Sequence, residues 1–318
     1  MWRRRSTSRR RAENSTLGNK RVHVALALFL AMGFPAHAWA QACCAGGSAV
    51  TPGRLKPYED ALVGVQVRAA GIVGSYDVGG RYVPSPAGDA ESDFEQDVLG
   101  ALRVLPRGQV TLLVPLVETL RSTPLDGSRF GGGIGDMNLS ARYDFVLAGE
   151  SNYFPGLALL AGITLPTGTS VESATEPLAV DATGIGTVQG QFGLAMEQTF
   201  GPWLANATAT VAARGPRFGE TLGTQVTLLA AGAYTFSNDS ALALAASYAF
   251  EGDATTTAGM PVPASSKRVT TVTVSVLWPL RGGWRLLGGL FVNPPIDALG
   301  SNQPATGGVT FTVIRSWS

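Results

Sequence analysis

The sequence predicts an all-β protein, a transmembrane antiparallel up-and-down β-barrel of about 12 strands with short periplasmic turns and long outer loops. Apolar and polar residues alternate in segment after segment, charged residues make up only 15% of the chain, and the connections are long and short in turn. Because successive side chains of a strand point to opposite faces, each such strand has one apolar and one polar face. A barrel with lipid outside and a polar lumen uses both faces.

The alternation is clearest over residues 136–147. From Met137 to Leu147 one parity is apolar or aromatic, whereas the other parity begins at Asp136 and stays polar until Val146. Eleven residues at about 3.4 Å each span roughly 37 Å, which is enough for a tilted strand to cross a bilayer. A strand of a soluble sandwich has the same local pattern, so the prediction of a barrel depends on repetition.

The pattern repeats along the whole chain after residue 60. The predicted strands are residues 61–76, 93–106, 109–120, 136–147, 157–165, 187–200, 203–213, 221–236, 242–251, 271–278, 284–293 and 307–317. Their apolar faces include, in the same order, Val63, Val98, Leu112, Leu139, Leu159, Leu194, Trp203, Leu228, Leu242, Val274, Trp284 and Val309.

The connections between these segments alternate in length. The long ones are residues 77–92, 121–132, 166–183, 214–220, 251–267 and 294–306, and the short ones are residues 106–108, 149–155, 201–202, 237–239 and 281–283. Short turns at one end, long loops at the other and an even strand number are typical of outer-membrane barrels.

Aromatic residues at the ends of the predicted strands indicate two membrane interfaces. Trp203, Trp278, Trp284 and Trp317 lie beside short turns or the C-terminus, which predicts one interfacial aromatic girdle. The expected opposite rim consists of Tyr76, Phe130, Tyr248, Phe250 and Phe291.

The N-terminal region has the pattern of an export signal. A basic stretch precedes the apolar run 22–34, and small-residue cleavage sites follow it, so residues 1–42 are predicted to be a cleaved signal peptide. We expect residues 43–60, rich in Gly, Ser and Pro, to form a flexible periplasmic leader, and residues 61–318 to form the barrel. The predicted location is the outer membrane of a Gram-negative bacterium.

Processing changes the charge and the chemistry that the chain can carry. Residues 1–42 hold eight of the 24 basic residues and one of the 23 acidic residues, so the mature chain carries about six net negative charges, which disfavours nucleic acid as a partner. Both histidines, His23 and His37, lie in the removed segment. The mature chain therefore lacks the residue for histidine-dependent catalysis or a His-ligated zinc site, and we expect no enzyme activity, cofactor or metal.

The two cysteines, Cys43 and Cys44, are adjacent at the expected mature N-terminus. Adjacent cysteines close only a strained ring, and two thiols alone make a poor metal site. A simple tail, lipidation or an intermolecular disulfide, and metal binding are the alternatives at this position.

If the apolar parity faces lipid, the other parity lines the lumen. The predicted lumen-lining residues on the solute path are Gln66, Arg68, Asp136, Asn138, Arg142, Asp144, Gln189, Gln191, Glu197 and Gln225. These side chains could bind a polar group of a solute or could neutralise one another in a plugged barrel.

Two short stretches, residues 133–143 (GIGDMNLSARY) and 159–168 (LLAGITLPTG), resemble the outer-membrane transporter family of the meta-pathway of phenol degradation. The resemblance implies a β-barrel channel or transporter for small hydrophobic or aromatic compounds, and it implies no catalytic residues. The last strand, with Trp317, resembles the insertion signal of such barrels for the barrel-assembly machinery, although the chain ends in Ser318 rather than in an aromatic residue.

Three other functions remain as alternatives to solute passage. A structural or adhesive barrel would act through its surface loops, for instance residues 166–183 and 251–267. An enzyme would have to work without histidine, using carboxylates such as Asp136, Asp144 and Glu197. A soluble secreted β-protein would bury the apolar parity in a core instead of in lipid.

Overall fold

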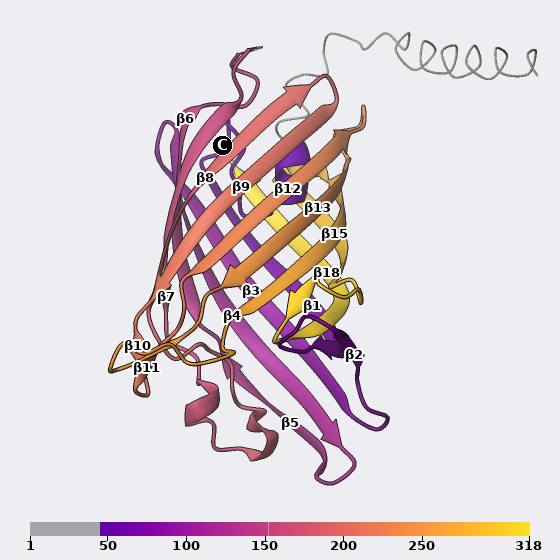
Figure 1. The fold of residues 1–318 in the computed structure, drawn as a ribbon. Helices are drawn as coiled ribbons and strands as arrows, with labels where there is room; N and C mark the ends of the chain where they lie inside the picture. Colours follow the sequence, from indigo (N-terminus) through magenta and orange to yellow (C-terminus); the bar gives the residue numbers. More distant parts are fainter. Residues whose placement is uncertain (1–44, 152) are drawn as a thin grey trace, which may run out of the picture. The chain divides into compact units, whose positions relative to one another are not determined.

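The structure, a computed structural model, describes residues 45–151 and 153–318. The predicted signal peptide, Cys43 and Cys44 lie outside the described residues. The described chain forms a closed antiparallel β-barrel of 12 strands (Figure 1). The predicted fold class is therefore confirmed.

Each barrel strand pairs with its neighbours in the chain, and the first pairs with the last. The strands are β1 (Ala61–Tyr76), β3 (Ala90–Leu105), β4 (Gly108–Thr123), β5 (Gly127–Ile134) continued by β6 (Met137–Val146), β7 (Gly156–Leu165), β8 (Gln189–Phe200), β9 (Trp203–Arg214), β12 (Gln225–Thr235), β13 (Ala241–Glu251), β15 (Lys267–Pro279), β16 (Trp284–Val292) and β18 (Gln303–Trp317). β5 and β6 both pair with β4, so they form one interrupted wall strand. β1 and β18 close the barrel from Ala61↔Trp317 to Tyr76↔Gln303.

The remaining elements are short. They are α3 (Gly47–Val50), β2 (Tyr82–Pro84), η2 (Val171–Ser173), η3 (Pro177–Ala179), β10 (Pro216–Arg217), β11 (Glu220–Thr221), β14 (Thr255–Thr256), η4 (Arg281–Gly283) and β17 (Gly300–Ser301). β10, β11 and β14 form a small separate sheet among the long loops. Among the described residues, no helix is long and apolar enough to span a membrane.

The predicted loop over residues 121–132 is wrong. β4 continues to Thr123, residues 124–126 turn, and β5 returns in register with β4 from Thr123↔Gly127 to Leu116↔Ile134. The glycine run 131–133 therefore belongs to a strand rather than to a loop. Close packing explains Gly131, because a Cβ built on it would lie 2.6 Å from Cγ2 of Val180.

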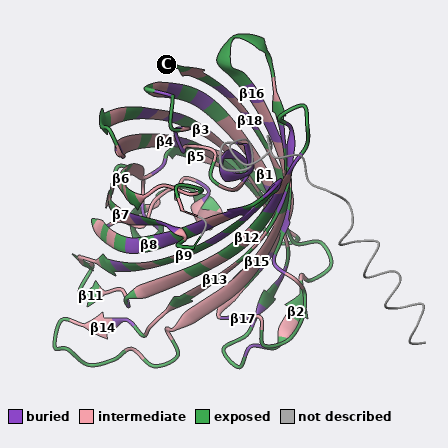
Figure 2. Ribbon diagram, turned by 90° about the horizontal axis from the view of Figure 1, so that it is seen from above, coloured by how far each residue is buried: buried purple, intermediate pink, exposed green. Residues whose placement is uncertain are grey.

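The two faces of the wall differ as the alternation predicts. Exposed and buried residues alternate along the strands (Figure 2). Large apolar side chains on the outer face are exposed, for example Leu194, Leu228 and Leu244. Many inward positions carry small or polar residues such as Ala243 and Thr312, and the inward leucines, such as Leu277, are buried.

The tryptophans lie on the outer face near the short turns. Trp203, Trp278, Trp284 and Trp317 are between 40% and 53% exposed. Trp203 meets the Tyr234 ring edge-on at a centroid distance of 4.9 Å. An interfacial girdle needs its tryptophans on the outer face, and the girdle itself stays a prediction.

Two aromatics assigned to the opposite rim lie elsewhere. Tyr76 is buried and donates its hydroxyl hydrogen bond to the carbonyl of Pro294. Phe291 is buried beneath the Arg68 guanidinium, which lies 4.5 Å from the ring centroid. The prediction was wrong for these two because an aromatic ring near a strand end can face inward as easily as outward.

The expected flexible leader is also different in the structure. Residues 45–60 lie inside the barrel at the end of the short turns, where α3 contacts β12, β13 and β15 (Figure 1). Ala45, Ala49 and Leu55 are buried there in one apolar cluster with inward side chains of the wall. We call residues 45–60 the plug segment.

A charge on the outer face should destabilise the barrel in a bilayer. Leu194→Arg should lower the free energy of unfolding by about 2–4 kcal/mol, because an outward arginine near the middle of a membrane strand loses hydration. Urea unfolding in lipid vesicles measures the change.

The matched variant is Gln191→Arg on the inward face of the same strand, which should cost far less. Equal losses for the two variants would contradict the assignment of the faces.

Candidate functional site

The candidate site is the lumen together with the plug segment that lies inside one end of it. The apolar part of the contact is tight. Ala45, Ala49 and Leu55 pack with Leu204 and Leu277 of the wall. A Cβ on Gly46 would lie 3.1 Å from the Cβ of Ala233, so glycine lets the plug segment approach the wall closely.

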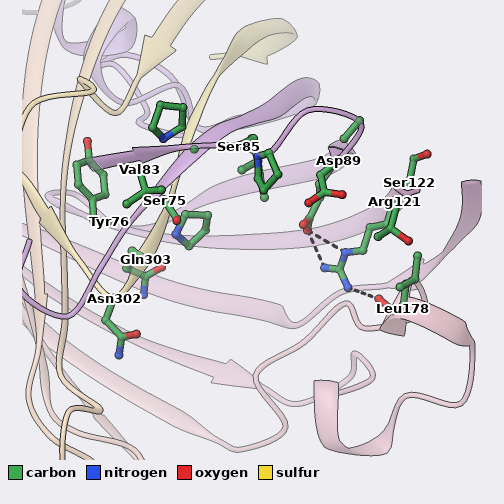
Figure 3. Close-up of a pocket in the computed structure, with 18 residues that line it drawn as sticks. Ser75, Tyr76, Val83, Ser85, Asp89, Arg121, Ser122, Leu178, Asn302 and Gln303 are labelled. Carbon is green, nitrogen blue, oxygen red and sulfur yellow. Dashed lines mark hydrogen bonds and ion pairs between the residues drawn. The ribbon is translucent and has the colours of Figure 1, made fainter. Parts of the chain in front are cut away.

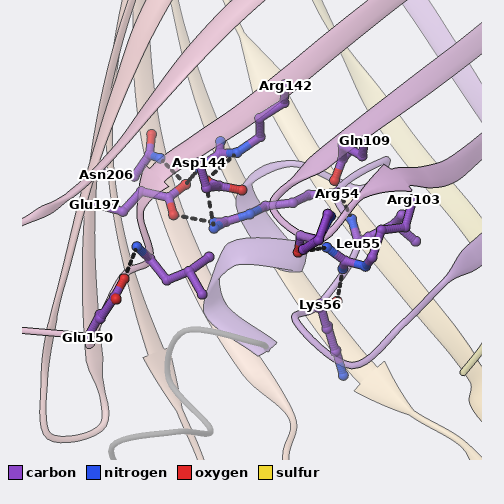
Figure 4. Close-up of polar contacts among 12 residues, drawn as sticks. Arg54, Leu55, Lys56, Arg103, Gln109, Arg142, Asp144, Glu150, Glu197 and Asn206 are labelled. Carbon is purple, nitrogen blue, oxygen red and sulfur yellow. Dashed lines mark hydrogen bonds and ion pairs between the residues drawn. The ribbon is translucent and has the colours of Figure 1, made fainter.

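A buried ion cluster joins the plug segment to the opposite part of the wall (Figure 4). Arg54 forms an ion pair with Glu197 and lies 4.0 Å from the carboxylate of Asp144. Arg142 pairs with both carboxylates, at 2.8 Å to Asp144 and 3.2 Å to Glu197, and Asn206 donates to Glu197 at 3.0 Å. Two arginines and two carboxylates compensate one another, with Arg54 and Glu197 buried and Arg142 and Asp144 half-buried.

Polar contacts on the other side of the plug segment involve Glu59. Its carboxylate accepts hydrogen bonds from Arg285 at 3.2 Å and from the Ser316 hydroxyl at 2.8 Å. Arg285 also donates to the hydroxyl of Ser48 at 3.0 Å. A glutamate of the plug segment is thus bound to β16 and β18.

Three wall side chains bind the backbone of the plug segment. The Gln109 side chain accepts from the N–H of Leu55 at 3.0 Å and donates to the carbonyl of Gly53 at 3.2 Å. Arg103 donates to the carbonyl of Lys56 at 2.6 Å, and Ser275 donates to that of Ala49 at 2.8 Å. The segment is held in one position without being part of the sheet.

A cavity of about 280 Å³ lies next to the plug segment. Thr51, Gly53 and Arg54 line it on one side. The wall contributes mostly polar side chains, among them Gln109, Ser140, Arg142, Gln191, Thr208 and Thr210. The cavity is therefore bounded in part by the plug segment.

Towards the outer end, β3 presents a row of carboxylates to the lumen. Asp93, Glu95 and Asp97 occupy alternate positions of the strand. Arg68 pairs with Glu95 at 3.3 Å, and Gln66 donates to Asp97 at 3.1 Å. The structure thus places Gln66 and Arg68, both predicted to line the lumen, against acidic neighbours.

A second polar group lies on the wall formed by β8, β9, β12 and β13. Arg214 donates to the side chains of Gln189 and Gln225 and pairs with Glu251 at 2.5 Å. Gln189 and Gln225, both predicted to line the lumen, are thereby brought together by Arg214, which was not among the predicted residues.

Asp136 and Asn138 lie where the interrupted strand β5–β6 meets the loop 166–188. The Asp136 carboxylate accepts from the N–H of Gly168 at 2.9 Å and from that of Ile185 at 2.6 Å. Asn138 donates to the Thr164 hydroxyl at 3.0 Å. Asp136 therefore anchors a loop.

The same loop is ordered internally by Asp181. Its carboxylate accepts hydrogen bonds from the N–H of Thr175 at 2.9 Å and from that of Glu176 at 3.3 Å. The backbone hydrogen bond from Thr175 lowers the pKa of Asp181 below its ordinary value. Since the folded pKa is depressed, these bonds persist at neutral pH and are lost only as the pH falls through that lowered value.

The functional residues that sequence reasoning missed share one property. Arg54, Gln109, Asn206, Arg214 and Arg285 each act through a partner on another segment of the chain, which for Asn206 is the adjacent strand β8. The inward parity would have marked Gln109, Asn206, Arg214 and Arg285 as lumen residues. Nothing in the sequence marks Arg54, which precedes the first alternating segment. Among the residues that the structure describes, no three His, Cys, Asp or Glu side chains are grouped as metal ligands.

The comparisons with known proteins concern the fold. No protein-family model and no curated protein matches the chain. The COG4313 outer membrane channel from Pseudomonas putida F1 superposes with a TM-score of 0.67 at 15% sequence identity, over 83% of this chain and 99% of that one. The structure of the KdgM porin, at 9% identity over 80% of this chain and 99% of that chain, has a TM-score of 0.44.

The translocator domain of the autotransporter NalP from Neisseria meningitidis also resembles the barrel, with a TM-score of 0.48 at 11% identity over 89% of this chain and all of that domain. The resemblance to the Pseudomonas channel supports the 12-strand outer-membrane barrel as the fold. The similarities to the KdgM porin and to the NalP domain have TM-scores below 0.5 and support no further conclusion.

Loss of the buried arginine should loosen the plug segment. Arg54→Ala leaves Glu197 and Asp144 with Arg142 as their only cation in the cluster, and breaking a buried ion pair costs about 3–5 kcal/mol. Hydrogen exchange in residues 45–60 should accelerate strongly while exchange in the barrel strands stays unchanged.

Arg107→Ala is the matched control. It removes an exposed arginine–glutamate pair with Glu150, 2.9 Å apart, and such pairs contribute about 0–1 kcal/mol. If hydrogen exchange in residues 45–60 of the Arg54→Ala variant equals that of the wild type, the ion cluster does not hold the plug segment.

Proposed function

We propose that this chain is an outer-membrane channel that passes small hydrophobic or aromatic solutes between its outer mouth and the periplasm. The observation that carries the proposal is a barrel with polar inward side chains in which a segment of the same chain occupies one end, next to a cavity. That segment is bound by side-chain contacts and continues covalently into β1 at Ala61. A closure of this kind can be released without disturbing the barrel.

The proposed membrane placement follows from the outer face. Its apolar side chains and tryptophans would contact lipid, with the short turns in the periplasm and the long loops outside. Residues 1–42 would direct export, and β18 would present the insertion signal to the barrel-assembly machinery.

The proposed passage needs the plug segment to leave its place. Solutes would enter between the long loops and move past the paired charges of β1, β3 and β9. The exit opens only when Arg54 separates from Glu197 and Glu59 separates from Arg285. The nature of the solute is supported by the resemblance of residues 133–143 and 159–168 to transporters of aromatic degradation.

The three carboxylates considered as candidate catalytic groups form other contacts in the structure. Asp136 binds the backbone of the loop 166–188, and Asp144 and Glu197 are paired with arginines. These contacts favour a channel over a hydrolytic site, and we propose no enzyme activity.

An adhesive barrel is the second candidate, and the small sheet β10–β11–β14 favours it because the sheet gives the outer loops a fixed surface. Replacing residues 252–266 by a short Gly-Ser linker should abolish surface attachment in that case and leave solute uptake unchanged. If the replacement abolishes solute uptake but leaves surface attachment unchanged, the adhesive function is excluded.

A disulfide between the plug segment and the wall should close the channel reversibly. Gly46→Cys with Ala233→Cys, in a background with Cys43→Ser and Cys44→Ser, places two Cβ atoms 3.1 Å apart. A shift of a few tenths of an ångström brings them to the roughly 3.5–4.5 Å of a disulfide. In proteoliposomes, uptake of a small aromatic solute should stop on oxidation and return on reduction.

Each single cysteine variant serves as the control and should show uptake that does not respond to the redox state. Equal uptake by the oxidised and reduced double variant would contradict displacement of the plug segment as the opening step. No uptake by any form would contradict the channel itself.

A further inference from the structure

The outer end of the barrel wall contains a notch between β1 and β3. Pairing between these strands ends at Gly71↔Ser92, although both strands extend beyond that point. β1 pairs instead with the short β2, and its register against β18 shifts near its end. A cavity of about 840 Å³ lies where the two parts of the wall separate (Figure 3). We call it the notch pocket.

The lining of the notch pocket combines rigid apolar groups with hydroxyl and amide groups. Its apolar residues include Ile72, Val83, Pro84, Pro86, Leu178 and Pro304. Proline fixes its own φ and has no N–H, so three of these positions are stiff and bring no unsatisfied donor. Ser75 and Gln303 add polar side chains at the same site.

Leu178 reaches this pocket from the loop 166–188 in a strained backbone conformation. Leu178 and Ala179 have φ values of 60° and 48°, which residues other than glycine seldom adopt. Arg121 holds both, because its Nη1 donates to the carbonyl of Leu178 at 2.6 Å and to that of Ala179 at 3.0 Å. Such strain persists only where the surroundings enforce it, and it is commonly found at ligand sites.

The charges beside the pocket neutralise each other. Arg121 donates through Nε to Glu91 at 2.9 Å and pairs with the same carboxylate through Nη2 at 2.8 Å. With Nη1 bound to carbonyls, every nitrogen of this guanidinium is engaged. The pocket thus offers no available cation for an anionic ligand, and Glu91 offers little to a cationic one. Asp89 also lines the pocket, but its carboxylate is exposed, so water screens its charge.

We propose that the notch pocket binds an uncharged ring-containing compound that carries one hydroxyl or carbonyl group. Its volume lies within the roughly 300–1,000 Å³ of small-molecule sites, and the mixture of apolar walls with a few polar groups is the usual composition of such sites. As a receiving site for the transported solute, the notch pocket rests on the proposed function. Binding itself does not depend on an open plug segment.

The test uses the full-length mature protein in detergent and 4-fluorobenzyl alcohol as the probe. Fluorine NMR should show broadening of the probe signal that saturates with concentration and exceeds the broadening in detergent alone. The charged analogues 4-fluorobenzoate and 4-fluorobenzylamine should bind at least about tenfold more weakly, because an unpaired charge is costly to desolvate.

Leu178→Asp is the main variant. Aspartate tolerates the left-handed backbone better than most residues, so the loop should keep its conformation while a charge enters the pocket. Val83→Asp places a charge on the other wall. Both should weaken binding of the probe at least about tenfold. The matched control Met260→Asp changes an exposed residue in a different outer loop and should bind like the wild type.

Heat-modifiable gel mobility should be unchanged in all three variants, which shows that the barrel has folded. Should Leu178→Asp and Val83→Asp both lose this mobility, Leu178→Asn and Val83→Asn replace them, with weaker binding again expected. Wild-type affinity in folded pocket variants, or equal binding of the charged analogues, overturns the proposal. Saturable probe binding by a protein that passes no solute in liposomes would refute the channel and leave the notch pocket standing. Uptake in liposomes without saturable probe binding would refute the notch pocket and leave the channel standing.

Discussion

Continuous backbone pairing around the barrel is the constraint on which the other features depend. In lipid every strand N–H and C=O must find a partner within the protein, and only a closed sheet leaves no edge unpaired. The pairing of β1 with β18 over nearly their whole lengths supplies that closure. Once the sheet is closed, strand alternation assigns each side chain to the outside or to the lumen, with no third choice.

The inner face then has to be satisfied within a confined space. Inward arginines lie beside carboxylates: Arg68 with Glu95, Arg142 with Asp144 and Glu197, and Arg214 with Glu251. The short-turn end also has apolar inward side chains, such as Leu204 and Leu277, and these would face water if the lumen were empty. The plug segment covers them with Ala45, Ala49 and Leu55 and adds Arg54 to the ion cluster. Closure of the exit and burial of the inner apolar surface are thus one event.

Most strands were predictable because the alternation with a period of two survives in every wall segment except β5. The plug segment was not, because its contacts are made one residue at a time: Leu55 with Gln109, Arg54 with Glu197, and Glu59 with Arg285. Such complementarity leaves no periodic trace in the sequence. The glycine run 131–133 misled for a related reason, since glycine marks both loops and places where another chain segment approaches a strand closely.

The predicted lumen residues show the same limit. Parity placed Gln66, Arg68, Gln189 and Gln225 on the inner face but could not tell which partners each would meet. Asp136 was expected on the solute path, and it anchors the loop 166–188 because the wall strand is interrupted between β5 and β6. Position on a face follows from local sequence, whereas depth in the lumen and partner choice follow from strand register and loop packing.

Single-channel conductance in planar bilayers tests most directly whether the plug segment closes a solute channel. The mature chain is compared with a chain that lacks residues 45–58, in which the barrel strands are intact. If the plug segment closes the channel, the mature chain should show small, intermittent currents and the shortened chain a larger, steady conductance. Equal conductances of the two chains, or no current from the shortened chain in its folded state, would contradict closure of a solute channel by the plug segment.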